Sequence, residues 1–169
     1  MSTGVGTHAG TNVRTAVHLT DAIMGTFQDI LAHLGLGVGY LNRHWAVIEE
    51  GLTTWIAEGS LEDVRLECGD PSNADAVFRV PLSYRVSGAG DITFVTSQAR
   101  LARALAKYES LPVGTAYRVV VSHRWTPSHV DGWSDTTAAD TSGMSSYHLG
   151  GVGSGPDASA SLTYHARGI

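Results

Sequence analysis

The stretch HWAVIEEGLTTWIAEGSLEDV, residues 44–64, decides the fold because the spacing of its apolar residues changes partway along it. The first part has the helical spacing of an amphipathic helix, predicted over about residues 40–58 and ended by Gly59. Its apolar stripe comprises Leu41, Trp45, Ile48, Leu52, Trp55 and Ile56. The period then falls to two, with Val64, Leu66 and Cys68 inward and Asp63, Arg65 and Glu67 outward. This alternation is typical of a strand with one buried face.

The same mixture of periods continues on both sides of this stretch. Further predicted elements are a helix over residues 17–34, strands over 76–86 and 117–125, a short extended piece over 92–95 and a helix over 98–108. Pro81 lies on the outward register of its strand, which indicates an edge strand or a bulge. The element order predicts an α+β fold in which about three helices cover one face of an antiparallel sheet.

Composition places the chain among globular proteins of one domain. It has 169 residues, of which 43% are hydrophobic, so it can bury a sizeable core. The net charge is −5 and the 11 Lys and Arg residues are scattered, which argues against direct nucleic-acid binding. The N-terminus lacks a signal-peptide pattern, and the apolar runs are too short for a bilayer. A cytoplasmic protein with no membrane contact is expected.

The motifs that could carry chemistry do not meet the requirements of a catalytic site. The glycines at 35, 37 and 39 follow a helix rather than a strand, so they predict a connector and not a dinucleotide loop. The run from Gly150 to Gly155 lacks the Lys-Ser/Thr of a P-loop and the glycine spacing of a nucleophile elbow, and is interpreted as a flexible bend. Cys68, the lone cysteine, excludes a disulfide and points into the core. Eight histidines form no HxH or HxxxH pair. We therefore expect no catalytic residue, metal or cofactor.

The C-terminal region, residues 126–169, combines a weak composition with a few strong anchors. It has no Lys and a single Arg, and it is rich in Gly, Ser, Thr and Ala, a composition that hardly offsets the entropy of ordering. The predicted anchors are Trp133, Tyr147, Leu149, Leu162 and Tyr164, each worth roughly 1.5–3 kcal/mol if buried. One interpretation is a segment that closes over an extended peptide bound at the sheet edge. The other is a long surface loop that Trp133 and Tyr147 merely hold down.

An ordered set of motifs resembles the bacterial HORMA proteins. Residues 44–64 are similar to that family's second-helix-to-strand signature. VDGWS at 130–134, DTSGM at 140–144 and HLG at 148–150 are similar to its C-terminal landmarks, in the same order. The resemblance spans about residues 12–165. It implies a HORMA fold with a flexible N-terminal arm (1–15), a core (16–125) and a mobile C-terminal safety belt (126–169).

The resemblance also implies a function, that of a peptide-binding signalling adaptor and not an enzyme. Such a protein switches between open and closed states and traps a closure peptide under its belt. In the closed state it binds and activates a cGAS/DncV-like nucleotidyltransferase, which makes a cyclic oligonucleotide in the anti-phage system CBASS. An AAA+ ATPase reopens it by pulling on the N-terminal arm.

The resemblance assigns residues to these roles. Contacts with the ATPase are expected at Thr11, Asn12, Val13 and Arg14. Belt anchors and peptide contacts are expected at Trp125, Trp133, Tyr147, Leu149, Leu162 and Tyr164, with Trp125 at the hinge. A chain ending before Thr126 is expected to keep a folded body that cannot hold peptide.

Two other functions remain open at this stage. The chain could be a small metal- or ligand-binding enzyme domain that uses the Gly-rich loop and histidines clustered in space. It could also be a HORMA-like protein that binds a phage peptide directly and acts as the sensor.

Overall fold

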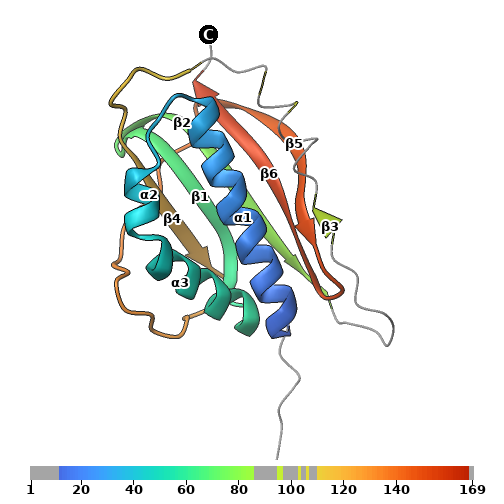
Figure 1. Cartoon of the computed structure of the whole chain (residues 1–169). Helices are drawn as coiled ribbons and strands as arrows, with labels where there is room; N and C mark the ends of the chain where they lie inside the picture. Colours follow the sequence, from blue (N-terminus) through green and yellow to red (C-terminus); the bar gives the residue numbers. More distant parts are fainter. Residues whose placement is uncertain (1–11, 86–94, 97–102, 104–105, 107–109, 168–169) are drawn as a thin grey trace, which may run out of the picture.

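The computed structural model describes residues 12–85, 95–96, 103, 106 and 110–167, and Figure 1 shows how they are arranged. Helices α1 (Val13–His33), α2 (Gly39–Arg43) and α3 (Trp45–Glu58) lie on one face of a six-stranded sheet. The strands are β1 (Leu61–Asp70), β2 (Asn73–Tyr84), β3 (Val95–Thr96), β4 (Tyr117–His123), β5 (Met144–Ser154) and β6 (Ala158–Arg167). Every pairing is antiparallel, in the order β3-β5-β6-β2-β1-β4. The predicted α+β architecture is confirmed.

The core lies between the helices and the sheet. The face of α1 that carries Leu19, Ile23 and Phe27 is fully buried, because these residues recur at helical spacing. From the sheet, Leu66 and Phe78 are equally buried and lie opposite each other across β1 and β2. Both therefore point to the helix-covered face, as the alternation in the sequence predicts.

The helix predicted over about residues 40–58 is in fact two helices, α2 and α3, separated at His44. Gly59 ends α3 with φ 80°, in the left-handed conformation that the sequence predicts for this position. The break lies where the Tyr40 carbonyl is contacted twice by His44. The backbone N of His44 is 3.2 Å from this oxygen and its ring Nδ1 is 2.9 Å away.

Pro81 is predicted to mark an edge strand or a bulge; the edge strand is wrong, because β2 lies between β6 and β1, and the pairing of β2 with β6 keeps one register across Pro81, so it shows no bulge. Pairing of β2 with β6 runs to Arg79–Thr163 and resumes at Leu82–Ala160. Pro81 has no N–H to donate, and it lies in this gap between the paired residues of β2 and β6. The strand predicted over 76–86 begins earlier, at Asn73, and its described part ends at Tyr84. The helix predicted over 98–108 and most of the extended piece over 92–95 lie outside the described residues.

The second half of the C-terminal region is part of the sheet. The run at 150–154, expected to be a flexible bend, lies inside β5, where the pairing with β6 shifts register twice. β6 lies directly beside β2, and Val152 of β5 and Leu162 of β6 are fully buried in the core. A chain ending before Thr126 would lose both strands and these core residues, which argues against the expectation that its body stays folded. The part that crosses the molecule without regular structure is residues 124–143, called here the covering segment.

The N-terminal boundary also differs from the expectation. Helix α1 begins at Val13, with Asn12 as its N-cap; the Asn12 side chain accepts a hydrogen bond from the backbone N–H of Thr15 at 2.8 Å. Val13 and Arg14, assigned to a flexible arm, are therefore helical, and Thr11 lies outside the described residues. No helix in the described part of the chain is long and apolar enough to cross a membrane.

Candidate peptide-binding site

Strand β4 forms one end of the sheet and offers its outer backbone edge to a further strand. Among the described strands it pairs with β1 alone. The N–H of Arg124 donates to the Ser60 carbonyl at 2.7 Å, and the Ala116 carbonyl accepts from Gly69 at 2.7 Å, so even-numbered backbone groups here face β1. Because successive residues of a strand alternate, the N–H and C=O groups of Val119 and Val121 face outward.

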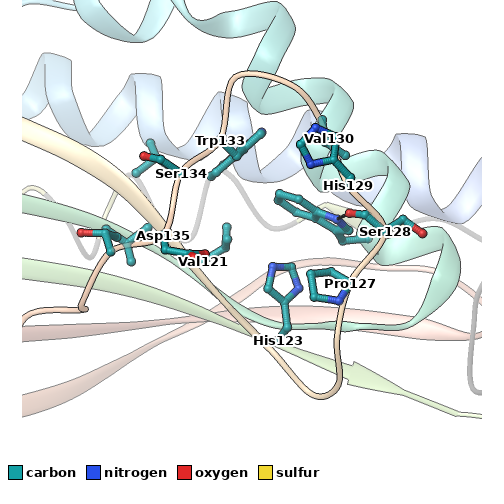
Figure 2. A pocket seen from close by; sticks show the side chains of 13 residues that line it. Val121, His123, Pro127, Ser128, His129, Val130, Trp133, Ser134 and Asp135 are labelled. Atoms are coloured by element: carbon teal, nitrogen blue, oxygen red, sulfur yellow. Dashed lines mark hydrogen bonds between the residues drawn. The ribbon is translucent and has the colours of Figure 1, made fainter.

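The covering segment encloses a groove along this edge. Figure 2 shows it leaving the end of β4, curving out past α3 and returning over the strand. Two cavities of about 340 Å³ and about 230 Å³ lie between the segment, β4 and α3. Residues that line both are Val119, Val120, Trp133, Ser134 and Thr136. The two cavities are therefore neighbouring compartments of one groove, and Trp133 belongs to the walls of both.

The first attachment of the covering segment is at the C-terminal end of α3. The Glu58 carboxylate accepts from the Ser128 hydroxyl at 2.6 Å and from the Ser128 N–H at 3.1 Å. The indole N–H of Trp55 donates to the Ser128 carbonyl at 2.8 Å. Burial acts to raise the pKa of Glu58, but hydrogen bonds from Ser128 and Ser60 outweigh it and hold this pKa below its ordinary value. The ionised carboxylate therefore favours the attached segment.

The second attachment brings Trp133 onto the middle of α3. Its indole N–H donates to the Val47 carbonyl at 3.1 Å, and its ring meets that of Trp55 edge-on, with centroids 4.9 Å apart. This approach depends on two glycines. A Cβ on Gly51 would lie 2.5 Å from the Trp133 ring nitrogen, and a Cβ on Gly132 would lie 2.7 Å from Val47 Cγ1. Gly132 also has φ +92°, a conformation that other residues rarely adopt.

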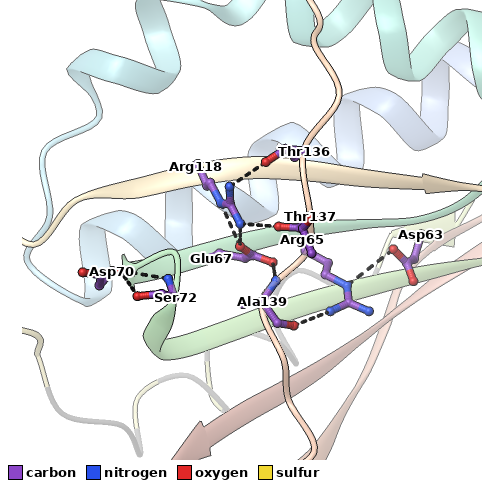
Figure 3. A network of polar contacts seen from close by, with 9 residues as sticks. All are labelled: Asp63, Arg65, Glu67, Asp70, Ser72, Arg118, Thr136, Thr137 and Ala139. Atoms are coloured by element: carbon purple, nitrogen blue, oxygen red, sulfur yellow. Dashed lines mark hydrogen bonds and ion pairs between the residues drawn. The ribbon is translucent and has the colours of Figure 1, made fainter.

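The third attachment lies on the other face of the sheet and is shown in Figure 3. The Glu67 carboxylate, 1% exposed, accepts from Arg118 Nε at 2.8 Å and from the N–H of Ala139 at 2.7 Å. Arg118 also donates to the Thr136 hydroxyl at 2.9 Å and to the Thr137 carbonyl at 2.8 Å. A buried carboxylate and its arginine thus hold the backbone of the covering segment against β1 and β4.

The start of the covering segment is fixed by a cation–π contact. The Arg124 guanidinium lies 5.1 Å from the centre of the Tyr84 ring and 4.9 Å from that of Trp125. Trp125, the predicted hinge residue, is 41% exposed. It is the first aromatic residue after β4 and stands where the chain leaves the sheet.

Of the predicted anchors and peptide contacts, the structure brings Trp133 to the groove and leaves four others away from it. Tyr147 and Leu149 lie on β5, and Leu162 and Tyr164 lie on β6, so β2 and β1 separate them from β4. Leu162 is a core residue, whereas Tyr147 is 49% exposed and stacks on Tyr164 with ring centroids 6.2 Å apart.

Several groups that hold the covering segment have little or no signal in the sequence. Glu67 lies on the outward register of its strand, and such a residue is usually solvated; here the segment buries it. Gly51 lies inside a helix, where glycine is unfavourable by up to about 1 kcal/mol relative to alanine. Its presence there is the one local sign in the sequence of a close contact with another segment. Glu58 and Arg118 carried no signal at all.

The described residues also bear on the enzyme alternative. Its Gly-rich loop lies in β5 and is not a loop. Within the described ranges, no three His, Cys, Asp or Glu residues are grouped so that they could hold a metal ion. Burial raises the pKa of the Cys68 thiol to about 12, so the thiol remains protonated and unreactive at neutral pH.

A strand edge enclosed by the chain's own C-terminal segment, on a sheet covered by helices, defines a class of domain in which a further strand can be added to the sheet beneath that segment. Comparison with known protein families identifies the family to which this domain belongs. The model described as "Bacterial HORMA domain 2" matches residues 2–168, and the chain belongs to this family. The family resemblance inferred from the ordered motifs is therefore confirmed. None of the curated proteins matches the sequence.

Solved structures with the same fold include a complex with a closure motif and a complex with CdnC. One is C. elegans HTP-1 bound to the HIM-3 closure motif, with a TM-score of 0.70 and 14% identity over 94% of this chain and 92% of that one. A chain of the mitotic checkpoint complex has a TM-score of 0.70 and 9% identity, over 94% of this chain and 98% of that one. The E. coli CdnC:HORMA-deltaN complex gives a TM-score of 0.56 and 10% identity, over 98% and 94%. These likenesses establish the HORMA fold.

Proposed function

We propose that this chain is a signalling adaptor that traps a closure peptide along β4 beneath its covering segment. The observation that carries the proposal is the outward-facing backbone of Val119 and Val121 inside the groove. A peptide that pairs with this edge gains backbone hydrogen bonds worth about 1 kcal/mol each, which is weak for a short ligand. A segment that closes over the peptide supplies the rest by slowing dissociation.

The attachments of the covering segment suit a reversible closure. Ser128, Trp133 and Ala139 meet the body at separate places, and β5 and β6 lie beyond them. The segment can therefore be released while the core between α1 and the sheet stays intact. We assign the arrangement in Figure 1 to the closed state, because the segment spans the edge of β4. In the open state these attachments would be broken and the edge exposed.

In the closed state the adaptor is proposed to bind and activate a cGAS/DncV-like nucleotidyltransferase in bacterial anti-phage defence. The shared fold with the HORMA protein of the CdnC complex supports this partner. An AAA+ ATPase is proposed to reopen the adaptor from the N-terminal side. The Asn12 N–H donates to the Asp157 carboxylate at 2.9 Å, so tension on the start of α1 would reach the turn between β5 and β6.

Reconstitution tests this function. The chain would be mixed with the nucleotidyltransferase encoded nearest to its gene, with and without a peptide that binds it. We expect cyclic oligonucleotide synthesis only when chain and peptide are both present, and a fall in synthesis when the neighbouring ATPase and ATP are added. Synthesis that is the same with and without the peptide-loaded chain would contradict the proposal.

A further inference from the structure

The two compartments of the groove, with Trp133 in the walls of both, restrict which peptides fit. Resting on the proposed function, we propose that the closure peptide carries two apolar side chains separated by one residue, a large one for the compartment of about 340 Å³ and a shorter one for that of about 230 Å³. The intervening residue is polar or small. This preference arises from β4, α3 and the covering segment of this chain.

The spacing follows from the geometry of strand pairing. A peptide paired with the outer edge of β4 has side chains that alternate between the α3 side and the opposite side. Val119 and Val121 pack against the helix-covered core, so the peptide side chains on their side point toward α3. Two such side chains are two residues, or about 6.6–6.8 Å, apart. They flank the Trp133 indole, which contributes to both compartments.

The larger compartment has the walls of an aromatic pocket. Trp55 and Val130 line it and are 3% and 6% exposed. The His123 ring lies edge-on to Trp55 at 4.6 Å and 82°, and burial lowers the pKa of His123 below its ordinary value. A neutral imidazole and an indole together suit an aromatic or long aliphatic side chain.

The smaller compartment has a different shape and lining. Val47 and Ile48 of α3 form its apolar part. Tyr40 and His44, whose ring centroids are 4.4 Å apart, narrow it at the end near α2. This arrangement favours a short aliphatic side chain. His44 is exposed, so its ring limits the compartment without being part of the core.

The side of the groove away from α3 carries polar groups of the covering segment beside the apolar Val120. Ser134 and Thr136 of the covering segment line both compartments, and the Thr136 hydroxyl accepts a hydrogen bond from Arg118 at 2.9 Å. The middle residue of the peptide points to this side. A large apolar residue there would bury these hydroxyl groups and remove their hydrogen bonds to water. No new hydrogen bond would compensate for this loss, which is unfavourable.

Selection from a phage-displayed random peptide library tests the inference with the full chain. We expect the enriched peptides to share two apolar positions separated by one residue, and alanine at either position to weaken binding about tenfold or more. His44→Ala enlarges the smaller compartment and should admit larger side chains only at the peptide position that fills it. Val121→Phe narrows the larger compartment and should exclude aromatic residues only at the peptide position that fills that one. Glu50→Ala, on the exposed face of α3, is the matched control and should leave the preference unchanged.

The outcomes separate the two proposals. Enriched peptides that bind the groove without the two-residue spacing, or an unchanged preference in His44→Ala, would overturn the inference and leave the adaptor function standing. A folded chain that enriches no peptide at all would contradict the adaptor function, and the inference with it.

Discussion

The indole of Trp133 lies directly on the backbone of Gly51, so close that a Cβ at Gly51 would come within 2.5 Å of the ring nitrogen. The second glycine makes a similar contact from the covering segment, since a Cβ at Gly132 would lie 2.7 Å from Val47 Cγ1. One glycine belongs to helix α3 and the other to the covering segment. Together they let the segment approach the helix at the middle of the groove.

Gly51→Ala should therefore detach the covering segment without weakening the body. Alanine is a better helix former than glycine, by up to about 1 kcal/mol, so α3 itself gains stability while Trp133 is displaced. Hydrogen exchange should quicken across residues 126–139, and a bound peptide should dissociate at least about tenfold faster. Gly37→Ala is the control, because a Cβ there meets nothing within 4 Å. Equal exchange rates in the two variants would show that the Gly51 contact is not needed for closure.

Glu67→Ala should release the covering segment at the attachment near its C-terminal end. The substitution leaves Arg118 without its carboxylate and the Ala139 N–H without its acceptor. Because the Arg118 side chain is partly exposed, the cost is below the value of about 3–5 kcal/mol for breaking a fully buried pair. We expect a lower melting temperature and faster exchange at residues 136–139. Glu62→Ala, an exposed residue of the same strand, should change neither. The account of this attachment is wrong if both variants melt alike.

Asp157→Ala should loosen the start of α1 and the turn between β5 and β6 together. The carboxylate is 4% exposed and accepts the Asn12 N–H at the positive end of the helix dipole. Losing a capping contact of this kind costs about 0.5–2 kcal/mol. Amide exchange should increase both in the first turn of α1 and at Ala158. Asp157→Asn keeps an acceptor and should have a smaller effect; a change confined to one of the two places would show that they are not coupled.

Stability should fall as the pH falls below neutrality. Burial, with Arg65 and Arg79 nearby, lowers the pKa of His165 below its ordinary value of 6.5. Just below pH 6.5 this imidazole is therefore still neutral in the folded chain but protonated in the unfolded chain. The unfolded state then binds a proton that the folded state does not, and the stability of the fold decreases as the pH drops below about 6.5. The free energy of unfolding should decrease between about pH 7 and about pH 5. His165→Gln should flatten this slope; equal slopes would refute the assignment.

The sequence predicted the elements whose burial has a simple period. The inward face of β1 and the stop at Gly59 follow from local spacing and backbone preference, and both are confirmed. The sequence could not predict the position of β6 beside β2, because long-range pairing depends on the whole sheet. The Gly- and Ser-rich β5 and the Ala- and Ser-rich β6 also have little hydrophobic pattern of their own, and their composition indicates mobility.

The position of the groove could be predicted only in part, for a related reason. Trp133 is conspicuous as the lone tryptophan of a polar region. Tyr147 and Leu162 stand out in the same way, yet they belong to strands β5 and β6. Glu67 looked solvent-facing because the segment that buries it lies about seventy residues away in the sequence. Contacts between distant segments leave no periodic signal.

The most direct test of the central claim is residue-specific amide exchange along β4, with and without a library-selected peptide bound to the chain. The claim is that the peptide pairs with the outer edge of this strand. The amides of Val119 and Val121 should then become protected on binding, while those of Val120 and Ser122, which face β1, should change little. A peptide that binds tightly without protecting Val119 and Val121 would contradict the account.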